Sequence, residues 1–397
     1  MNTAATEGAE ILSPGQRPLL MVTTMDLGIL NGPSQHFLNL ARQLFALGHP
    51  VTVVSPKPQQ PIPDSMLGGL TVRHAANVRR LGLPGALNVF TLAPTIRSLR
   101  SFTSTLYLRS SPMTATLAML ARPLGMSRVV VEHNGWLSDE VQAFGYARPL
   151  VHLTRVLQRA EALRADKIRV VTQGLKTILT SEGVDAAKVM VIGNGTDTRQ
   201  FRPMNAAQCR SELGITVDEP LLGFVGNLWA AVDLGIVFEA MAILKRRGAP
   251  ARIVIAGDGV QRAELERKAR LLLGEDAALF LGHLSPERTN IVINAADVVV
   301  APFHRARNER IGLSPLKIRD YAAAGIACAA TDIGGIDELR NEPWIFLAGP
   351  DDPLSYADAI ASALAADRTI VRNRARAYAE THFDWSVVAR QVSMLIG

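Results

Sequence analysis

The sequence predicts an α/β protein built from two doubly wound parallel sheets, a Rossmann-like architecture. Short apolar runs rich in β-branched residues, such as residues 298–300, have the length and composition of buried parallel strands. Segments with apolar residues at helical spacing separate these runs, and strands that alternate with helices form parallel sheets. At 397 residues the chain is too long for one ordinary core, so we expect two domains.

The composition and net charge indicate which kinds of molecule the protein could bind. Hydrophobic residues make up 48% of the chain and aromatic residues only 5%, which suits many packed helices. The net charge of +6 suits a polyanion such as a nucleoside diphosphate or an anionic membrane face. No dense run of Lys and Arg is interleaved with aromatic residues, so we expect no nucleic-acid partner. Cys209 and Cys328 lie far apart, which gives no disulfide framework or zinc-ligand spacing and suits a reducing cytoplasm.

Membrane insertion is not expected. Residues 1–16 lack the basic and apolar regions of a signal peptide and are predicted to be a disordered tail. No apolar stretch approaches the ~18 residues of a membrane span, so we expect a cytoplasmic protein whose membrane contact, if any, is peripheral. Residues 95–102 carry Arg97 and Arg100 beside apolar side chains, a pattern that can rest on anionic lipid. A solvated helix face is the favoured interpretation of that pattern.

The first strand is expected at residues 17–24 and is followed by a loop that contains Gly28 and Gly32. A helix from about Ser34 and a strand at 51–54 complete a βαβ unit. Ligands of open α/β sheets bind at such loops, beyond the carboxyl ends of the strands. The loop does not match G-x-G-x-x-G, so a dinucleotide site is weakly supported, and a plain turn is the alternative.

Residues 128–136 predict a strand that ends in a polar tip. Glu132, His133 and Asn134 precede Gly135, at a position where a site in a parallel sheet is expected. The alternative is a histidine and an asparagine whose side chains only form the hydrogen bonds of a turn.

Further along, Asn194 and Gly195 follow another strand and mark a tight turn at the end of the first domain.

The segment 295–325 is the strongest candidate for a binding site. After the strand at 298–300, a loop with Arg305, Arg307 and Arg310 reaches a helix predicted to have Ser314 at its N-cap, Pro315 at N1 and Gly325 past its end. Backbone N–H groups and the helix dipole at such a terminus attract anions, and arginine favours phosphate. Lys317, Asp320 and Tyr321 share one helix face, where the carboxylate could accept ribose hydroxyls. The alternative is an ordinary capped helix behind a solvated basic loop.

This segment resembles the donor-binding segment of retaining GT-B glycosyltransferases of family 4. The match lies at Ser314-Pro315-Leu316-Lys317, Tyr321-Ala322 and Ala324-Gly325. Glu132 to Gly135 and the stretch from Asn194 to Pro203 are similar to other segments of the family, and the resemblance covers nearly the whole chain from Leu19. Two positions depart from the pattern. Asp320 stands where the family usually has glutamate, and Gly312 stands at its other acidic position, which Glu309 could replace.

The resemblance implies the domain organisation and the site. Residues 17–203 would form an acceptor-side domain and residues 204–382 a nucleotide-sugar donor domain across a cleft, with a helix at 383–397 packing back on the first. Catalytic roles would fall on His133, Glu309 and Lys317. Donor binding would fall on Gly32, Asn227, Gly282, His283, Leu284, Arg310, Gly312, Leu313, Ser314 and Asp320.

One departure bears on activity. Relatives place an arginine just after the glycine that matches Gly226, and a lysine a few residues on, to grip the diphosphate. Here Asn227 follows, and no cation occurs before Asp233. Either the arginines of the 305–310 loop and Lys317 supply the charge, which we favour, or transfer activity is weak or absent.

The predicted function is the retaining transfer of a sugar from a nucleoside diphosphate sugar, UDP favoured over GDP, to an acceptor hydroxyl. The acceptor could be a small molecule, a glycan or a lipid-linked molecule. The sequence contains no D-x-D pair or Cys/His cluster, so no metal or other cofactor is expected. The alternatives are a nucleotide-sugar epimerase or a sugar phosphorylase on the same fold, or a catalytically silent nucleotide-sugar-binding subunit. The oligomeric state stays open.

Overall fold

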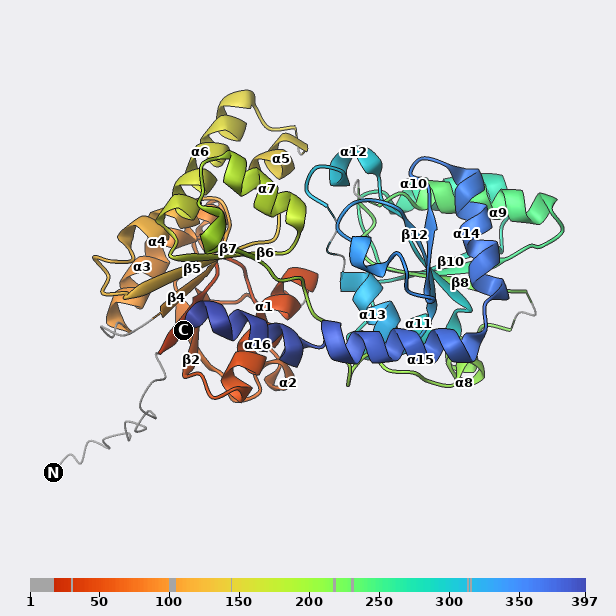
Figure 1. The fold of residues 1–397 in the computed structure, drawn as a ribbon, viewed down its shortest axis with the longest axis horizontal. Helices are drawn as coiled ribbons and strands as arrows, with labels where there is room; N and C mark the ends of the chain where they lie inside the picture. Colours follow the sequence, from red (N-terminus) through yellow and green to blue (C-terminus); the bar gives the residue numbers. More distant parts are fainter. Residues whose placement is uncertain are drawn as a thin grey trace. The chain divides into compact units, whose positions relative to one another are not determined.

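A computed structural model describes residues 18–29, 31–99, 105–143, 145–216, 219–229, 232–312, 314 and 316–397. The chain divides into two compact units (Figure 1). The first comprises residues 1–169, 183–190 and 389–397, and the second comprises residues 170–182 and 191–388. Each contains a parallel sheet, as the alternation of strands and helices predicted.

The first sheet has seven strands in the order β3-β2-β1-β4-β5-β6-β7. Its strands are β1 (Leu19–Val22), β2 (Val51–Pro56), β3 (Thr71–Ala75), β4 (Thr105–Arg109), β5 (Arg128–His133), β6 (Lys167–Val170) and β7 (Val189–Val191). Leu19 pairs in parallel with Val51 on one side and Thr105 on the other, so β1 is an interior strand of the sheet. All four residues of β1 are buried, which explains its uniformly apolar sequence.

Helices connect these strands: α1 (Gly32–Ala46), α2 (Asp64–Leu67), α3 (Val89–Ser98), α4 (Thr114–Leu120), α5 (Leu137–Ala143), α6 (Arg148–Arg164) and α7 (Gln173–Ser181). Helix α1 starts two residues before the predicted Ser34. The side chain of Asn31 accepts a hydrogen bond from the Ser34 backbone N–H, and the Ser34 hydroxyl accepts one from the Asn31 N–H. This reciprocal cap satisfies N–H groups that the first helical turn leaves free.

The second sheet has six parallel strands in the order β10-β9-β8-β11-β12-β13. They are β8 (Leu221–Val225), β9 (Arg252–Ala256), β10 (Ala278–Gly282), β11 (Val298–Ala301), β12 (Ala327–Thr331) and β13 (Ile345–Ala348). The helices of this unit are α8 (Ala206–Glu212), α9 (Leu234–Arg246), α10 (Arg262–Leu273), α11 (Pro286–Ala295), α12 (Arg305–Asn308), α13 (Leu316–Ala324), α14 (Pro353–Ala365) and α15 (Arg368–Tyr378). The last helix, α16 (Trp385–Ile396), begins in this unit, and its residues from 389 on belong to the first unit. Chain order reverses between β1 and β4 and between β8 and β11. Ligands of doubly wound sheets bind at such reversals, beyond the carboxyl ends of the strands.

The segment after β11 differs from the predicted loop. Residues 305–308 form one helical turn, α12, in which the Asn308 amide donates to the His304 carbonyl at 2.8 Å. Helix α13 begins at Leu316, and Leu313 and Pro315 lie outside the described residues. Gly325 has φ +74°, the conformation expected of a glycine just past a helix.

Helix α3 ends at Ser98, and residues 100–102 of the predicted lipid-binding pattern lie outside the described residues. Among the residues that the structure describes, no helix is both long enough and apolar enough to cross a bilayer.

Candidate functional site

The loop after β1 is held in one shape by Asp26. Its carboxylate accepts the backbone N–H of Gly28 at 3.0 Å and that of Gln59 at 3.1 Å, which ties this loop to the end of β2. A Cβ at Gly28 would lie 2.2 Å from the Gln60 carbonyl oxygen, so a side chain would force the two segments apart. The predicted donor residue Gly32 opens α1 on the far side of this loop.

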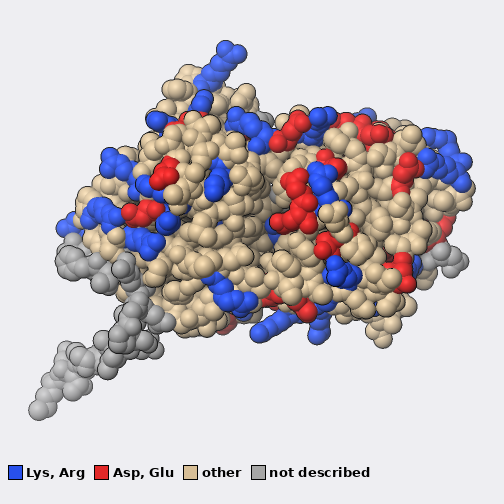
Figure 2. All heavy atoms as spheres, viewed as in Figure 1, with Lys and Arg blue, Asp and Glu red and all other residues tan. Residues whose placement is uncertain are grey.

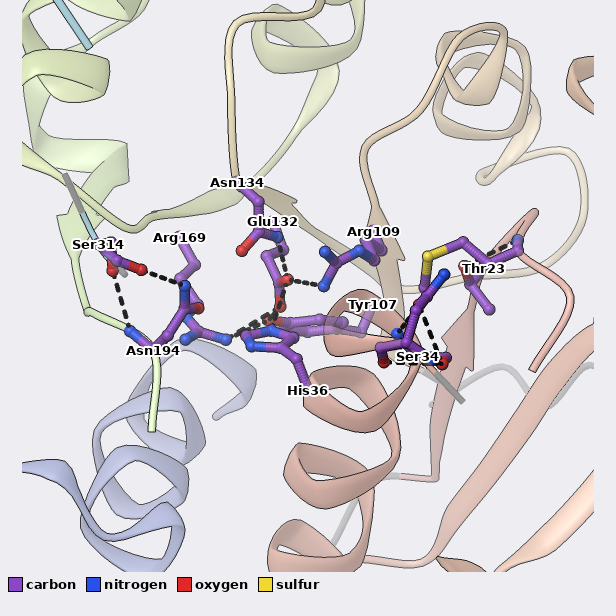
Figure 3. A network of polar contacts seen from close by, with 12 residues as sticks. Thr23, Ser34, His36, Tyr107, Arg109, Glu132, Asn134, Arg169, Asn194 and Ser314 are labelled. Carbon is purple, nitrogen blue, oxygen red and sulfur yellow. Dashed lines mark hydrogen bonds and ion pairs between the residues drawn. The ribbon is translucent and has the colours of Figure 1, made fainter. Parts of the chain in front are cut away.

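Glu132, the last but one residue of β5, is the centre of a buried polar network (Figure 3). Its Oε1 accepts the Arg109 guanidinium at 2.9 Å and lies 2.9 Å from His36 Nε2. Its Oε2 accepts the Arg169 guanidinium at 3.0 Å and the Tyr107 hydroxyl at 2.5 Å. The amide of Asn134 also donates to Oε1. Helix α1 and the ends of strands β4, β5 and β6 therefore converge on one carboxylate.

The two guanidinium groups keep the Glu132 carboxyl ionised although it is buried. Burial alone would raise the pKa of Glu132, but the hydrogen bond from His36 and the two guanidinium groups hold it well below its usual range. Burial lowers the pKa of His36 to about 4, so its imidazole is neutral at pH 7. Five donors occupy the two oxygens of Glu132, which leaves no lone pair free to take a proton from a substrate. Glu132 therefore organises the strand ends.

His133, the next residue, is fully buried, and its ring is oriented by Gln158 of α6. The Gln158 amide oxygen accepts the Leu137 backbone N–H at 2.8 Å, and its nitrogen donates to the Gly135 carbonyl at 3.1 Å. These bonds fix which end of the amide faces His133. Gln158 Nε2, 3.0 Å from His133 Nδ1, must be the donor, so Nδ1 accepts and the proton of a neutral imidazole sits on Nε2.

With this orientation, the His133 imidazole is uncharged and can donate a hydrogen bond through its Nε2–H. Burial lowers the pKa of His133 to about 4, so it is uncharged at neutral pH. Its Nε2 makes no hydrogen bond to the described part of the protein. A buried N–H without a partner typically costs about 1–3 kcal/mol, and such a group is often kept for a ligand. The sequence could not reveal Gln158, because it lies 25 residues from His133 in a different element.

In the second unit, Lys317 is a cation without a counter-ion among the described residues. Its Nζ lies 4.2 Å from the centre of the Phe224 ring and 5.1 Å from that of Phe303, beside the ends of β8 and β11. It makes no hydrogen bond or ion pair with any residue of that described part. Burial lowers the pKa of Lys317 from 10.5 to about 7. Among the described residues, the ammonium is therefore stabilised by aromatic faces and its charge is not compensated by a carboxylate.

Glycines bring the neighbouring strand ends close together. Gly257 has φ +150°, and a Cβ there would lie 1.9 Å from the Gly226 carbonyl oxygen. The Gly226 N–H donates to the Ala256 carbonyl at 3.0 Å, and the Gly257 N–H donates to the Gly282 carbonyl at 2.8 Å. A Cβ on Gly226, whose φ is +143°, would lie 3.0 Å from the Lys317 ammonium. The backbone after β8 therefore lies against this cation without a side chain between them.

Ser314 and Asp320 contact the segment after β7. The Asn194 amide nitrogen donates to the Ser314 carbonyl at 3.2 Å. The Thr196 hydroxyl donates to Asp320 Oδ1 at 2.6 Å. Burial raises the pKa of Asp320 to about 7, against the opposing effect of the Thr196 hydrogen bond. The predicted ribose contact of Asp320 stays a prediction.

Comparison with known proteins agrees with this architecture. The family profile described as "Glycosyl transferase 4-like domain" matches residues 31–195, and that described as "Glycosyl transferases group 1" matches residues 219–366. The chain belongs to the GT4-type glycosyltransferase family and has the GT-B fold.

Individual relatives and a solved structure extend this likeness. The chain is 32% identical over 219 residues to D-inositol 3-phosphate glycosyltransferase of Nocardia farcinica, a match that covers 52% of this chain and 47% of the relative, about half its length. It is 28% identical over 421 residues to D-inositol 3-phosphate glycosyltransferase of Frankia alni, covering 94% of this chain and 95% of that one. Anabaena HepE in complex with UDP-glucose superposes with a TM-score of 0.74 at 18% identity, covering 96% of this chain and 99% of that one.

The remaining residues predicted for this GT4-type site differ in their exposure and in the contacts they make. Glu309 is exposed and pairs with Arg305 at 3.0 Å, one helical turn earlier. Arg310, Asn227 and His283 are exposed, and Leu284 packs against a small apolar cluster. Gly312 has φ +78°, and a Cβ there would lie 3.1 Å from the Gly334 carbonyl oxygen. Leu313 lies outside the described residues.

One group of side chains in the GT4-type chain has the composition of a metal site. Asp233, His304 and Asp351 each offer a ligand atom, and these atoms lie within 4.8 Å of one another. Asp233 already caps α9 through the Ile236 N–H at 3.2 Å and lies 3.4 Å from His304 Nδ1. The Asp233–His304 contact is therefore explained without an ion.

Proposed function

We propose that the protein transfers a sugar from a UDP-sugar to an acceptor hydroxyl with retention of the anomeric configuration. The observation that carries this proposal is Lys317, a cation without a partner among the described residues, at the ends of β8 and β11. Anabaena HepE, which shares the fold, was crystallised with UDP-glucose. UDP is preferred over GDP on that likeness.

The diphosphate would be held by Lys317, the backbone N–H groups at the start of α13 and Arg310. As the bond between the anomeric carbon and the diphosphate breaks, negative charge grows on the leaving oxygen. Preorganised donors at that point typically contribute about 2.7–4 kcal/mol each to lowering the barrier. Lys317, which lies 3.0 Å from the position of a Cβ on Gly226, would take over the role of the cations that relatives carry after this glycine.

The acceptor oxygen would form its bond on the same face of the sugar from which the diphosphate leaves. Its proton would pass to the departing phosphate oxygen, so no protein base is required. The Nε2–H of His133 would donate to a sugar hydroxyl, a role that its neutral state and orientation by Gln158 allow. Glu309 remains a catalytic candidate, but its ion pair with Arg305 would have to break before it could act on a substrate. Asn227, Gly282, His283 and Leu284 are proposed to contact the nucleoside through their backbone, and Asp320 the ribose.

Neither a metal ion nor a separate cofactor is required by this proposal. Charge on the diphosphate would be balanced by Lys317 and Arg310. The cytoplasmic location stays a prediction, supported by two buried cysteines that are not paired with each other.

The decisive experiment measures UDP-glucose binding by calorimetry for the native protein and for Lys317→Met and Arg310→Ala. We expect both substitutions to weaken binding, Lys317→Met by at least about tenfold, the worth of one hydrogen bond to a charged group. The exposed Arg267 of α10, which is not among the residues proposed to bind the donor, provides the control Arg267→Gln, which should bind as the native protein does. Native affinity in both site variants would contradict the proposal.

Product analysis separates the alternatives. Incubation with a UDP-sugar alone would give a second UDP-sugar if the protein were an epimerase. Dependence of turnover on orthophosphate would identify a phosphorylase. NMR of the transferred sugar reports whether the anomeric configuration is retained.

A further inference from the structure

Charge is distributed unevenly along the chain. Residues 18–169 contain 16 Lys and Arg against 7 Asp and Glu, a net charge of +9, whereas residues 170–397 contain 25 against 27. Residues 65–131 contain eight arginines and no acidic residue at all. On the face shown in Figure 2, blue and red spheres lie intermingled over the elements of the second unit, as these counts lead one to expect. The positive charge of the protein therefore belongs to the first unit.

Within the acid-free stretch, one turn exposes large apolar side chains next to arginines. It follows β3 and joins two short 3₁₀ helices, residues 78–81 and 85–88. All residues from Arg79 to Pro84 are exposed, and Leu81 has 77% of its surface accessible. Leu83 is 46% exposed, and Phe90, at the start of α3, is 58% exposed. We call Arg79, Arg80, Leu81, Leu83 and Phe90 the basic-apolar turn.

This turn is anchored to the site end of the first sheet. The Val78 backbone N–H donates to the Asn88 side chain at 2.9 Å, which closes the turn at its base. The Asn88 amide in turn lies 3.4 Å from the Thr24 carbonyl, two residues beyond β1. Arg80 donates to the Pro58 carbonyl at 2.9 Å. The apolar tip thus projects from a fixed base beside the loop that carries Gly28 and Gly32.

No acidic side chain of the described residues neutralises the arginines of the turn. Neither Arg79 nor Arg80 forms an ion pair within that part of the chain. Helix α15 of the second unit provides a contrast, because its Arg368, Arg374 and Arg376 pair with Asp297, Glu342 and Glu380 at 2.8, 3.6 and 2.7 Å. Exposed aliphatic side chains between uncompensated cations are the composition of surfaces that lie in the headgroup region of anionic bilayers.

We propose that the basic-apolar turn docks the protein on an anionic lipid bilayer. Leu81, Leu83 and Phe90 enter the boundary of the acyl chains while Arg79 and Arg80 contact headgroup phosphates. A nucleic acid fits less well, because proteins that bind single strands stack successive bases on several aromatic side chains, and the basic-apolar turn has one, Phe90. Docking does not depend on the proposed transfer reaction, but it would bring a lipid-borne acceptor beside the first-unit loops.

The test is sedimentation of the full-length protein with vesicles. We expect binding to vesicles of phosphatidylglycerol mixed with phosphatidylcholine, weaker binding as salt is raised, and none to phosphatidylcholine alone. Arg79→Gln with Arg80→Gln should lower the partition coefficient roughly 30-fold, at about fivefold per arginine. Leu81→Ser with Leu83→Ser should lower it about tenfold or more.

Two matched controls lie in the second unit. Leu271 of α10 is 77% exposed, the same as Leu81, and Arg267 is exposed on that helix. Leu271→Ser with Arg267→Gln should leave vesicle binding unchanged. UDP-glucose affinity of every variant reports folding and separates this proposal from the proposed function. The proposal would be overturned if the native protein did not sediment with the anionic vesicles, or if the turn variants bound them as well as the native protein does. Binding of single-stranded DNA in place of vesicles would also overturn it.

Discussion

Lys317→Met should make the unliganded protein more stable while it weakens donor binding. The native side chain buries most of its ammonium against Phe224 and Phe303, with no acidic partner among the described residues. Methionine keeps a similar length and apolar contact with both rings, and it removes the charge. The two effects have opposite signs, so a general loss of structure cannot imitate the result.

The pKa of Lys317 sets the size of the stability effect. The ordinary value is 10.5 and burial lowers it to about 7. At about 1.4 kcal/mol per pKa unit, the difference corresponds to at most roughly 5 kcal/mol, and less because the side chain keeps some contact with solvent. Between pH 7 and 10.5 the unfolded chain binds a proton that the folded protein lacks, so stability rises with pH in this window. Lys317→Met should abolish that rise and be the more stable protein at pH 7.

The same pKa predicts proton uptake on binding. At pH 7 about half of the Lys317 side chains are neutral, and a bound diphosphate restores the charged form. Calorimetry with UDP-glucose, whose diphosphate does not titrate near neutral pH, should therefore show uptake of about 0.5 proton at pH 7 in buffers of different ionisation enthalpy. Uptake should vanish in Lys317→Met.

The assay measures the free energy of unfolding in urea at pH 7 and pH 9 for the native protein and Lys317→Met, together with the calorimetric titrations of both proteins. A Lys317→Met protein that is less stable at pH 7, or that binds UDP-glucose with unchanged affinity, would refute the reasoning. Native proton uptake in that variant would assign the titrating group elsewhere.

Three further predictions concern the buried polar groups. Gln158→Leu should let His133 populate its second tautomer, visible in imidazole ¹⁵N spectra, and lower the transfer rate roughly tenfold, the worth of one hydrogen bond; a single unchanged tautomer would contradict the role of Gln158. Glu132→Gln removes the carboxylate that two buried guanidinium groups share and should cost roughly 3–5 kcal/mol in urea unfolding, so a loss below about 1 kcal/mol would show that the network is not held by charge. Asp320 has its pKa raised from 3.8 to about 7, so the folded protein binds the extra proton between these values and stability falls as pH rises through them. Asp320→Asn should remove that fall and lower UDP affinity about tenfold; an unaltered UDP dissociation constant would exclude the ribose contact.

The candidate site divides into parts that were predictable and parts that were not. Ser314, Lys317 and Asp320 could be singled out because a helix terminus, its cap and the spacing along one helix face are local properties of the chain. The partners of these residues could not, since Phe224 lies in β8, Phe303 lies just after β11, and Thr196 lies 124 residues before Asp320.

Glu132 illustrates the same limit in the first unit. The sequence indicates it as part of a polar strand end, beside His133. It gives no sign of Tyr107, Arg109 and Arg169, because each lies in a strand segment of ordinary composition. Only lateral pairing of β4, β5 and β6 brings their side chains to one carboxylate.

The sequence by itself determined the α/β class, the division into two sheets and the family, because periodicity, turn glycines and the 314–325 motif are written in short stretches of chain. Tertiary structure decided the ionisation states. A carboxylate, an imidazole and an ammonium acquire their pKa values from groups that the order of strands places beside them, and from the water that packing removes. Lys317 is an ordinary lysine in the sequence, and its pKa falls to about 7 only because the fold buries it beside Phe224 and Phe303.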